Sequence, residues 1–185
     1  MNIEKLFSNS SIMVSLDADR FLFDRVQQVI AAGISTVEIG SSDIEMLQQL
    51  MRAFPHVQFG AGNVVTIQQL EACYQAGLAF ASSPGYVPAI ANTAAIYSMN
   101  YLPGVATISE AMTAFHNGCL HVRPFPASLA LCSLLNEYLP ELNLYPGHVA
   151  VDEVEDFLNL PNVQSVSLHN PNVKNLNALL DVLAA

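Results

Sequence analysis

Three histidines and one acid of this chain occupy positions from which a protein could do chemistry near neutral pH. His121 lies inside a short apolar run, while His148 and His169 stand at or just beyond the ends of two later runs. Together with Glu38, these imidazoles could bind a divalent metal ion, or each could be a hydrogen-bonded residue of the core. The chain contains neither an HxH nor an HExxH pattern, so we expect no metal and no cofactor.

Eight short apolar runs indicate the elements that would position these residues. Successive runs begin 19 to 24 residues apart, the length of a compact strand, loop, helix and loop. The runs are Ile12–Leu16, Thr36–Gly40, Val57–Ala61, Phe80–Pro84, Tyr101–Val105, Leu120–Phe125, Leu142–Pro146 and Ser165–His169. They predict an α/β protein, a small single-domain (β/α)8 TIM barrel over residues 1–185, with functional groups at the C-terminal ends of its strands. A doubly wound open sheet would show the same periodicity.

Helix signals fall between the runs. Thr66 and Gln69 have the spacing of a capping box, in which each side chain bonds to the backbone N–H of the other. Gly33, Gly77 and Gly118 each follow a helical segment, where a left-handed residue often ends a helix. These signals agree with a helix after each strand.

The composition excludes several classes of protein. Of 185 residues, 52% are apolar and 12% charged, and six basic against sixteen acidic residues give a net charge of -10. A phosphate-binding surface needs clustered basic side chains, so we expect neither nucleic acid nor a membrane surface as a partner. Mean hydropathy is +0.36. No apolar stretch, however, approaches the roughly 20 residues of a membrane span.

The N-terminus and the cysteines indicate the cellular compartment. Residues 1–7 lack a basic region followed by an apolar core, so we expect no secretory signal. Cys73, Cys119 and Cys132 are odd in number and lack CxxC spacing. They are typical of reduced, buried thiols in a cytoplasmic protein.

Five segments resemble motifs of a known family, in the same order and at similar separations over roughly residues 10 to 160. They are Ala31–Ile39, similar to AGGxxxxEV; Phe59–Val64, similar to VGAGTV; Ala76–Gly85, similar to AGAxFxxSPG; Pro103–Glu110, similar to PGxxTxxE; and Phe125–Ala127, similar to FFPAE. The chain therefore resembles the bacterial 2-keto-3-deoxy-6-phosphogluconate (KDPG) and 4-hydroxy-2-oxoglutarate (KHG) aldolases.

The resemblance implies a homotrimer of (β/α)8 barrels and a lyase that reversibly cleaves a 2-keto acid to pyruvate and an aldehyde through a Schiff-base lysine. Glu38 matches the family's general base, and Arg123 matches the lysine. A permanently protonated guanidinium cannot form a Schiff base. The chain has only two lysines, Lys5 and Lys174, neither on a middle strand. A lysine of a neighbouring subunit could also reach the barrel mouth.

The same resemblance assigns five substrate-binding positions. Ser42 stands where the family has an arginine that binds the substrate carboxylate, and Asn63 stands where it has a threonine. Pro84 belongs to the SPG motif. His148 and His169 fall in segments that replace the family's glycine-rich phosphate-binding loops. The expected ligand is therefore a small 2-keto acid or another small anion.

Two functions follow from this pattern. In the first, the protein is a lyase with Glu38 as acid and base and Arg123 as the clamp for the substrate carboxylate. This reaction would need an electrophile other than a mid-barrel lysine, such as a metal held by some of His121, His148 and His169. In the second, it is a catalytically lapsed aldolase homologue that binds a small anion or serves as an assembly partner. Glu38 and Arg123 would then form an internal ion pair.

Overall fold

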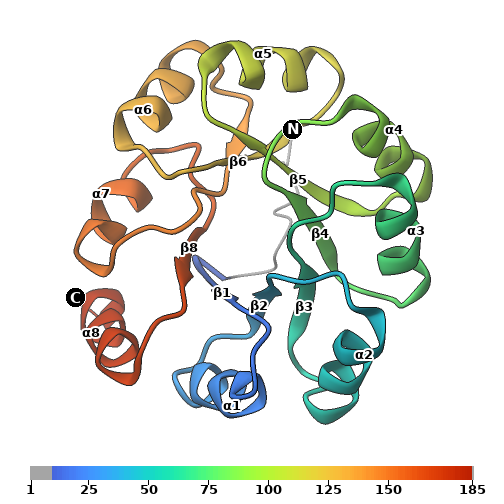
Figure 1. The fold of residues 1–185 in the computed structure, drawn as a ribbon. Helices are drawn as coiled ribbons and strands as arrows, with labels where there is room; N and C mark the ends of the chain where they lie inside the picture. The colour runs from blue at the N-terminus through green and yellow to red at the C-terminus, as the bar shows by residue number, and fades with distance from the viewer. Residues whose placement is uncertain (1–9, 185) are drawn as a thin grey trace.

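The computed structural model describes residues 10–184, which form strands alternating with helices (Figure 1). The strands are β1 (Ile12–Leu16), β2 (Thr36–Ile39), β3 (Gln58–Ala61), β4 (Phe80–Ser83), β5 (Asn100–Val105), β6 (His121–Pro124), β7 (Asn143–Leu144) and β8 (Val166–His169). The helices are α1 (Leu22–Ala31), α2 (Ile44–Ala53), α3 (Ile67–Gln75), α4 (Pro88–Tyr97), α5 (Ile108–His116), α6 (Leu129–Tyr138), α7 (Val154–Leu158) and α8 (Val173–Ala184), with a short 3-10 helix η1 (Val151–Glu153) before α7.

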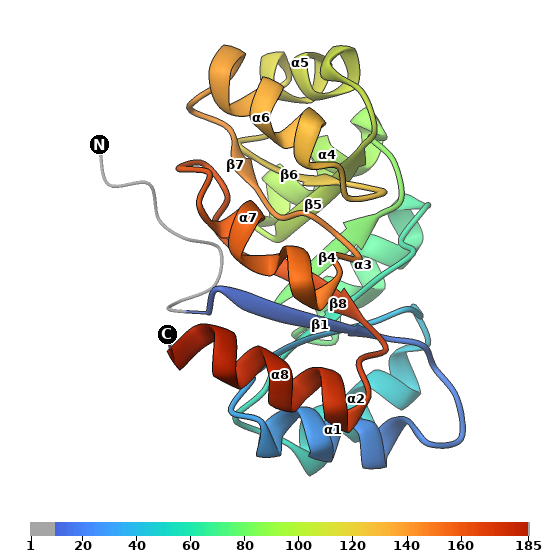
Figure 2. The ribbon, with the colours of Figure 1, turned by 90° about the vertical axis from the view of Figure 1, so that its left-hand side faces the viewer.

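The parallel strands follow one another around a closed barrel. Strand β1 pairs with both β2 and β8, and the remaining strands are neighbours in chain order. Bridges between Leu144 and Val163 and between Gly147 and Ser167 join the β7 segment to the β8 segment. The helices form an outer ring (Figures 1 and 2). This confirms the predicted (β/α)8 fold and excludes the doubly wound sheet, in which strand order reverses.

The predicted runs and helix signals correspond closely to the observed elements. Every predicted run overlaps a strand, although β5 begins one residue earlier than its run and β7 is two residues long where five were expected. That run includes Pro146, which has no backbone N–H to donate to a neighbouring strand. The capping box of Thr66 and Gln69 is present, and a second one at Thr107 and Glu110 begins α5. Gly33, Gly77 and Gly118 have the expected positive φ angles of 78°, 80° and 86°.

The larger core lies between the strands and the helices, and a second cluster fills the inside of the barrel. The inner cluster consists of Met13, Phe80, Leu102 and Tyr145, each at most 1% exposed. Residues two positions apart on a strand face the same side. Ser15 therefore follows Met13 into the interior, and Ser82 follows Phe80. The barrel interior thus changes from apolar to polar toward the C-terminal ends of its strands.

Two further expectations concern the cysteines and the membrane. Cys73, Cys119 and Cys132 are unpaired, with Cys73 and Cys132 buried, as predicted. Burial raises the pKa of the Cys132 thiol to about 12. Within residues 10–184, no helix combines the length and apolarity needed to cross a membrane.

The interior packing gives a first prediction. A Cβ atom at Gly60 would lie 2.3 Å from ring carbons of Phe80, which is fully buried. We expect Gly60→Ala to lower the free energy of unfolding by about 1–3 kcal/mol, because the added methyl group overpacks the inner cluster. Urea denaturation measures this loss. Gly85→Ala is the matched control, since a Cβ at Gly85 meets nothing within 4 Å. Equal stability of both variants would contradict the prediction.

Candidate active site

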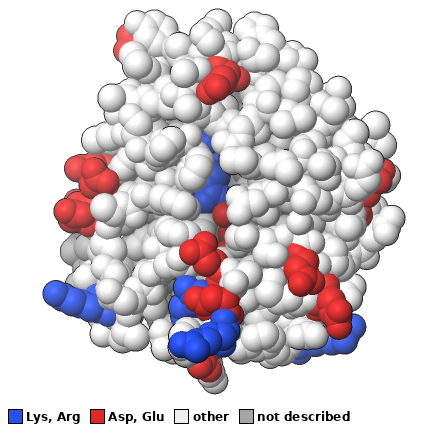
Figure 3. Space-filling view, in the orientation of Figure 1, with Lys and Arg blue, Asp and Glu red and all other residues white. Residues whose placement is uncertain are grey.

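A pocket opens at the C-terminal ends of the strands, where the barrel interior becomes polar. Its cavity measures about 100 Å³, far below the roughly 300–1,000 Å³ of sites for drug-sized ligands. It is lined by Ser15, Leu16, Asp17, Glu38, Gly40, Asn63, Ser82, Ser83, Pro84, Arg123, Phe125, His148 and His169. Figure 3 shows the corresponding hollow at the centre of a face that is mostly free of charge. A cavity of this size suits a ligand of a few heavy atoms.

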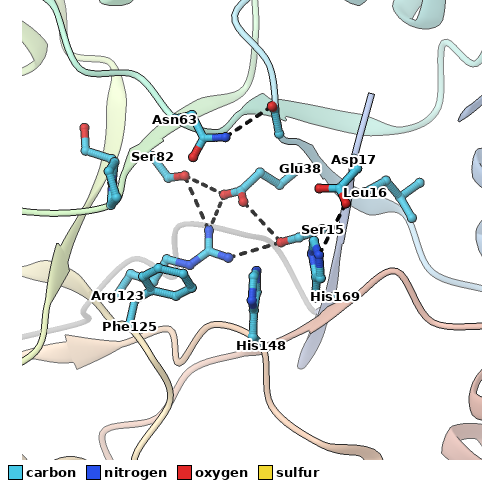
Figure 4. A pocket seen from close by; sticks show the side chains of 13 residues that line it. Ser15, Leu16, Asp17, Glu38, Asn63, Ser82, Arg123, Phe125, His148 and His169 are labelled. Carbon is cyan, nitrogen blue, oxygen red and sulfur yellow. Dashed lines mark hydrogen bonds and ion pairs between the residues drawn. The ribbon is translucent and has the colours of Figure 1, made fainter. Parts of the chain in front are cut away.

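A buried ion pair forms the floor of the pocket. Glu38 on β2 and Arg123 on β6 are 5% and 4% exposed. Arg123 Nη1 donates a hydrogen bond to Glu38 Oε2 (Figure 4). The two charges therefore neutralise each other across the barrel, and each is the main partner of the other.

Three serines complete the hydrogen bonding of this pair. Ser82 Oγ donates to Glu38 Oε2 at 2.6 Å, and Ser15 Oγ donates to Glu38 Oε1 at 3.1 Å. Ser15 Oγ also accepts from Arg123 Nη2 at 3.1 Å and lies 2.7 Å from Ser167 Oγ. Glu38 thus accepts three hydrogen bonds, from Arg123, Ser82 and Ser15.

Gly147 provides the space for the arginine. A Cβ atom at Gly147 would lie 2.4 Å from Arg123 Nε, so no larger residue fits there beside the guanidinium. The same Nε is buried without a hydrogen-bond partner. The guanidinium therefore presents its Nη edge, and not Nε, toward Glu38 and the serines.

Two stacked imidazoles stand at the mouth of the pocket. The rings of His148 and His169 have centroids 4.0 Å apart and planes 20° apart, and Phe125 meets His148 edge-on at 4.9 Å. His148 has a positive φ of 65°, a strained conformation for this residue. Burial, followed by the nearby His169 and Arg123, lowers the pKa of His148 to about 4. His148 is therefore neutral near pH 7.

An acidic residue faces the imidazoles. Asp17 Oδ2 accepts a hydrogen bond of 2.7 Å from Asn170 Nδ2 and lies 3.6 Å from His169 Nε2. Arg25 donates to Asn170 Oδ1 at 2.6 Å and forms an ion pair of 2.9 Å with Asp19. The guanidinium of Arg25, which lies close to Asp17, is thus already engaged by Asp19 and Asn170.

Six of the seven predicted site residues line the pocket, namely Glu38, Asn63, Pro84, Arg123, His148 and His169. Ser42 does not; its hydroxyl accepts a hydrogen bond from Gln69 Nε2 at 3.0 Å instead. Asn63 donates to the carbonyl oxygen of Gly40 at 3.2 Å. The structure thus brings together the predicted acid, arginine and histidines but leaves Ser42 outside.

His121 is separate from the other two histidines. It lies two positions before Arg123 on β6, below the pocket, where its Nδ1 is 3.3 Å from Tyr145 Oη. Among the residues that the structure describes, no three His, Cys, Asp or Glu side chains gather closely enough to hold a metal ion. The suggested set of three histidines and Glu38 therefore does not form.

Sequence reasoning missed the serines and Asp17. Ser15, Ser82 and Ser167 each lie inside an apolar run, facing the barrel interior. A polar residue at an inward position of a buried strand is the signal that could have identified them. No comparable signal marks Asp17, which lies just after β1 and is 62% exposed.

Comparison with known proteins assigns the family. The sequence matches the family described as KDPG and KHG aldolase over residues 6–170. The chain belongs to this aldolase family. Its similarity to a 2-dehydro-3-deoxy-phosphogluconate aldolase of Pseudomonas aeruginosa is 26% identity over 162 residues, or 83% of this chain and 74% of the relative. The KHG/KDPG aldolase of Escherichia coli is 28% identical over 102 residues, covering 54% of this chain and 48% of the relative.

Solved structures of the aldolase family share the fold. A KDPG aldolase of Legionella pneumophila, with pyruvate captured as a covalent carbinolamine, is 26% identical with a TM-score of 0.77. That alignment covers 95% of this chain and 92% of the Legionella chain. The Zymomonas mobilis KDPG aldolase with 3-phosphoglycerate has a TM-score of 0.81 at 21% identity, over 95% and 91% of the two chains.

The ion pair gives a second prediction. Arg123→Met removes the cation beside a buried carboxylate, so we expect the free energy of unfolding to fall by about 3–5 kcal/mol. Adding Glu38→Gln removes the uncompensated charge and should recover much of that loss. Denaturant unfolding of the single and double variants measures both effects. A double variant no more stable than Arg123→Met would contradict the assignment of the loss to Glu38.

His121 gives a third prediction, on pH dependence. Burial lowers the pKa of His121 to about 4, against about 6.5 for histidine in an unfolded chain. Between these values the unfolded state binds more protons, so the stability present above about pH 6.5 declines as the pH falls toward 4. We expect His121→Gln to make this decline shallower. Urea unfolding at about pH 7.5 and about pH 5 tests it; an unchanged slope would contradict the prediction.

Proposed function

We propose that this aldolase-family protein binds a small 2-keto acid or similar carboxylate in the strand-end pocket and does not cleave it through a Schiff base of its own pocket. The supporting observation is the cation on the pocket floor. In the part of the chain that the structure describes, Arg123 is the only Lys or Arg that lines the pocket, and a guanidinium does not condense with a keto group. Lys174 lines a separate depression beside α8.

The pocket floor offers a binding mode for a carboxylate. Arg123 carries five N–H groups, of which its contacts with Glu38, Ser82 and Ser15 use three. These contacts leave one N–H of Nη2 unused, and Arg123 is among the residues that line the pocket. A carboxylate or keto oxygen placed there would receive a charge-assisted hydrogen bond from a group that is already held in place.

The hydrogen bonds of Glu38 favour a role in ligand binding over a role as an acid–base catalyst. Its two oxygens already accept from Arg123, Ser82 and Ser15. These three hydrogen bonds occupy three of the roughly four lone-pair positions of the carboxylate, so a proton from a bound ligand would compete with donors that are already in place. The lyase function that the family and its pyruvate-bound Legionella member suggest would additionally need an amine from outside the pocket, such as a lysine of another copy of the chain.

We further propose that residues 1–185 are one domain, located in the cytoplasm, and that the protein assembles as a homotrimer. A structural neighbour of this chain is part of a protein cage designed by fusing symmetric oligomeric domains, which supports the assembly, and the three unpaired cysteines support the location. Light scattering coupled to size-exclusion chromatography measures the assembly directly. A monomer or dimer would contradict the trimer.

Trapping with borohydride gives a fourth prediction and tests the proposed function. Incubated with pyruvate and borohydride, the wild-type protein should bind pyruvate reversibly and gain no mass. Arg123→Lys places an amine on the pocket floor, and we expect mass spectrometry to show one reduced pyruvyl adduct on that lysine. Calorimetry with pyruvate measures binding to the wild-type protein.

The controls separate the two functions. Arg123→Met provides no amine at this position and should gain no adduct there. An adduct on the wild-type protein, located by peptide mapping to Lys5 or Lys174, would favour the lyase function. Absence of pyruvate binding by the wild-type protein would overturn the proposed function.

A further inference from the structure

The charges at the pocket mouth differ from those on its floor. Asp17 lines the mouth and its side chain is 62% exposed, so its negative charge faces any ligand that enters. Its polar contacts are the Asn170 amide and the His169 ring. Neither carries a fixed positive charge that would neutralise the carboxylate.

The cations near the mouth are already engaged. Arg123 is paired with Glu38 on the floor, and within residues 10–184 it is the only Lys or Arg side chain lining the pocket. Arg25 approaches from α1, but its guanidinium bonds to Asp19, Asn170 and the carbonyl oxygen of Asp17. A second anionic group on a ligand would therefore meet Asp17 without a free cation to receive it.

The imidazole pair adds an aromatic wall beside Asp17. His148 and His169 stack at 4.0 Å, and the edge contact with Phe125 holds the pair in place. An imidazolium at His148 would be disfavoured by a second ring with centroid only 4.0 Å away whenever that ring is charged. Burial lowers the pKa of His148 in the same sense. This wall offers an aromatic surface to a short carbon chain.

We propose that Asp17 and the stacked rings of His148 and His169 make the pocket selective for a short 2-keto monocarboxylate whose far end is uncharged. The carboxylate and keto groups of the ligand lie toward Arg123, and its carbon chain points to the mouth. A ligand with a phosphate or a second carboxylate at its far end places that charge near Asp17 and is rejected. This inference rests on the proposed function and names the ligand class of the same site.

A matched pair of ligands tests the inference. 2-Oxopentanoate and 2-oxoglutarate have the same carbon chain and differ only in a terminal methyl against a terminal carboxylate. Titration calorimetry on the full chain should give at least about fivefold tighter binding of 2-oxopentanoate, the factor expected for one unscreened charge pair in water. Added salt should reduce this preference, because the mouth is exposed to solvent.

Two variants locate the preference in the named residues. Asp17→Asn should lower the ratio of the two affinities toward one, whereas Asp24→Asn makes the same charge change on α1, away from the pocket, and should leave the ratio unchanged. His148→Lys places a cation at the mouth and should shift the preference toward 2-oxoglutarate. Circular dichroism checks that each variant is folded.

Each outcome decides between the two proposals. If neither ligand nor pyruvate binds, the proposed function fails and the inference fails with it. If both ligands bind with equal affinity, or 2-oxoglutarate binds more tightly, only the inference is overturned. A preference that is unaffected by salt and by Asp17→Asn would also overturn it, since the selectivity would then come from shape and not from charge.

Discussion

The ion pair between Glu38 and Arg123 is the interaction on which the rest of the site depends. Two charges of opposite sign are almost fully removed from water inside the barrel. Each would carry a large desolvation penalty alone, so neither can be positioned without the other. The remaining polar atoms of the pair must also be satisfied, which explains why Ser15 and Ser82 occupy inward strand positions that an apolar residue would otherwise fill.

The barrel supplies this pair with a rigid frame. Strands β2 and β6 lie on different sides of the barrel, and the apolar cluster around Phe80 fills the space beneath the two side chains. Family membership and fold are therefore compatible with more than one chemistry. The identity of one side chain on β6 decides whether the floor of this pocket offers a nucleophilic amine or a fixed hydrogen-bond donor.

The sequence was sufficient to predict the fold. Runs at regular spacing located every strand, because a strand buried on both faces needs a continuous apolar segment. The capping box at Thr66 and the glycines that end helices were readable because they act through local backbone geometry. Closure of the barrel was not readable, since the bridge between Gly147 and Ser167 joins segments whose pairing leaves no local pattern.

The site was predictable in part. Motif positions identified Glu38 and Arg123, but contacts among residues from five strands and the loops that follow the strands, such as the stacking of His148 on His169, arise only from the folded barrel. For Ser42, the motif position wrongly predicted a place in the pocket. A position occupied in the family by a long arginine does not remain in the pocket when a short hydroxyl side chain replaces it, and here that hydroxyl bonds to Gln69.

The fit between Gly147 and Arg123 restricts the order in which this site could have changed during evolution. With the guanidinium in place, any side chain at position 147 collides with its Nε atom. A glycine had to be present before, or together with, the arginine, and it cannot be replaced while the arginine remains. The two positions, on neighbouring strand segments, are thus coupled: a larger residue at position 147 requires a change in the side chain at position 123 first or at the same time.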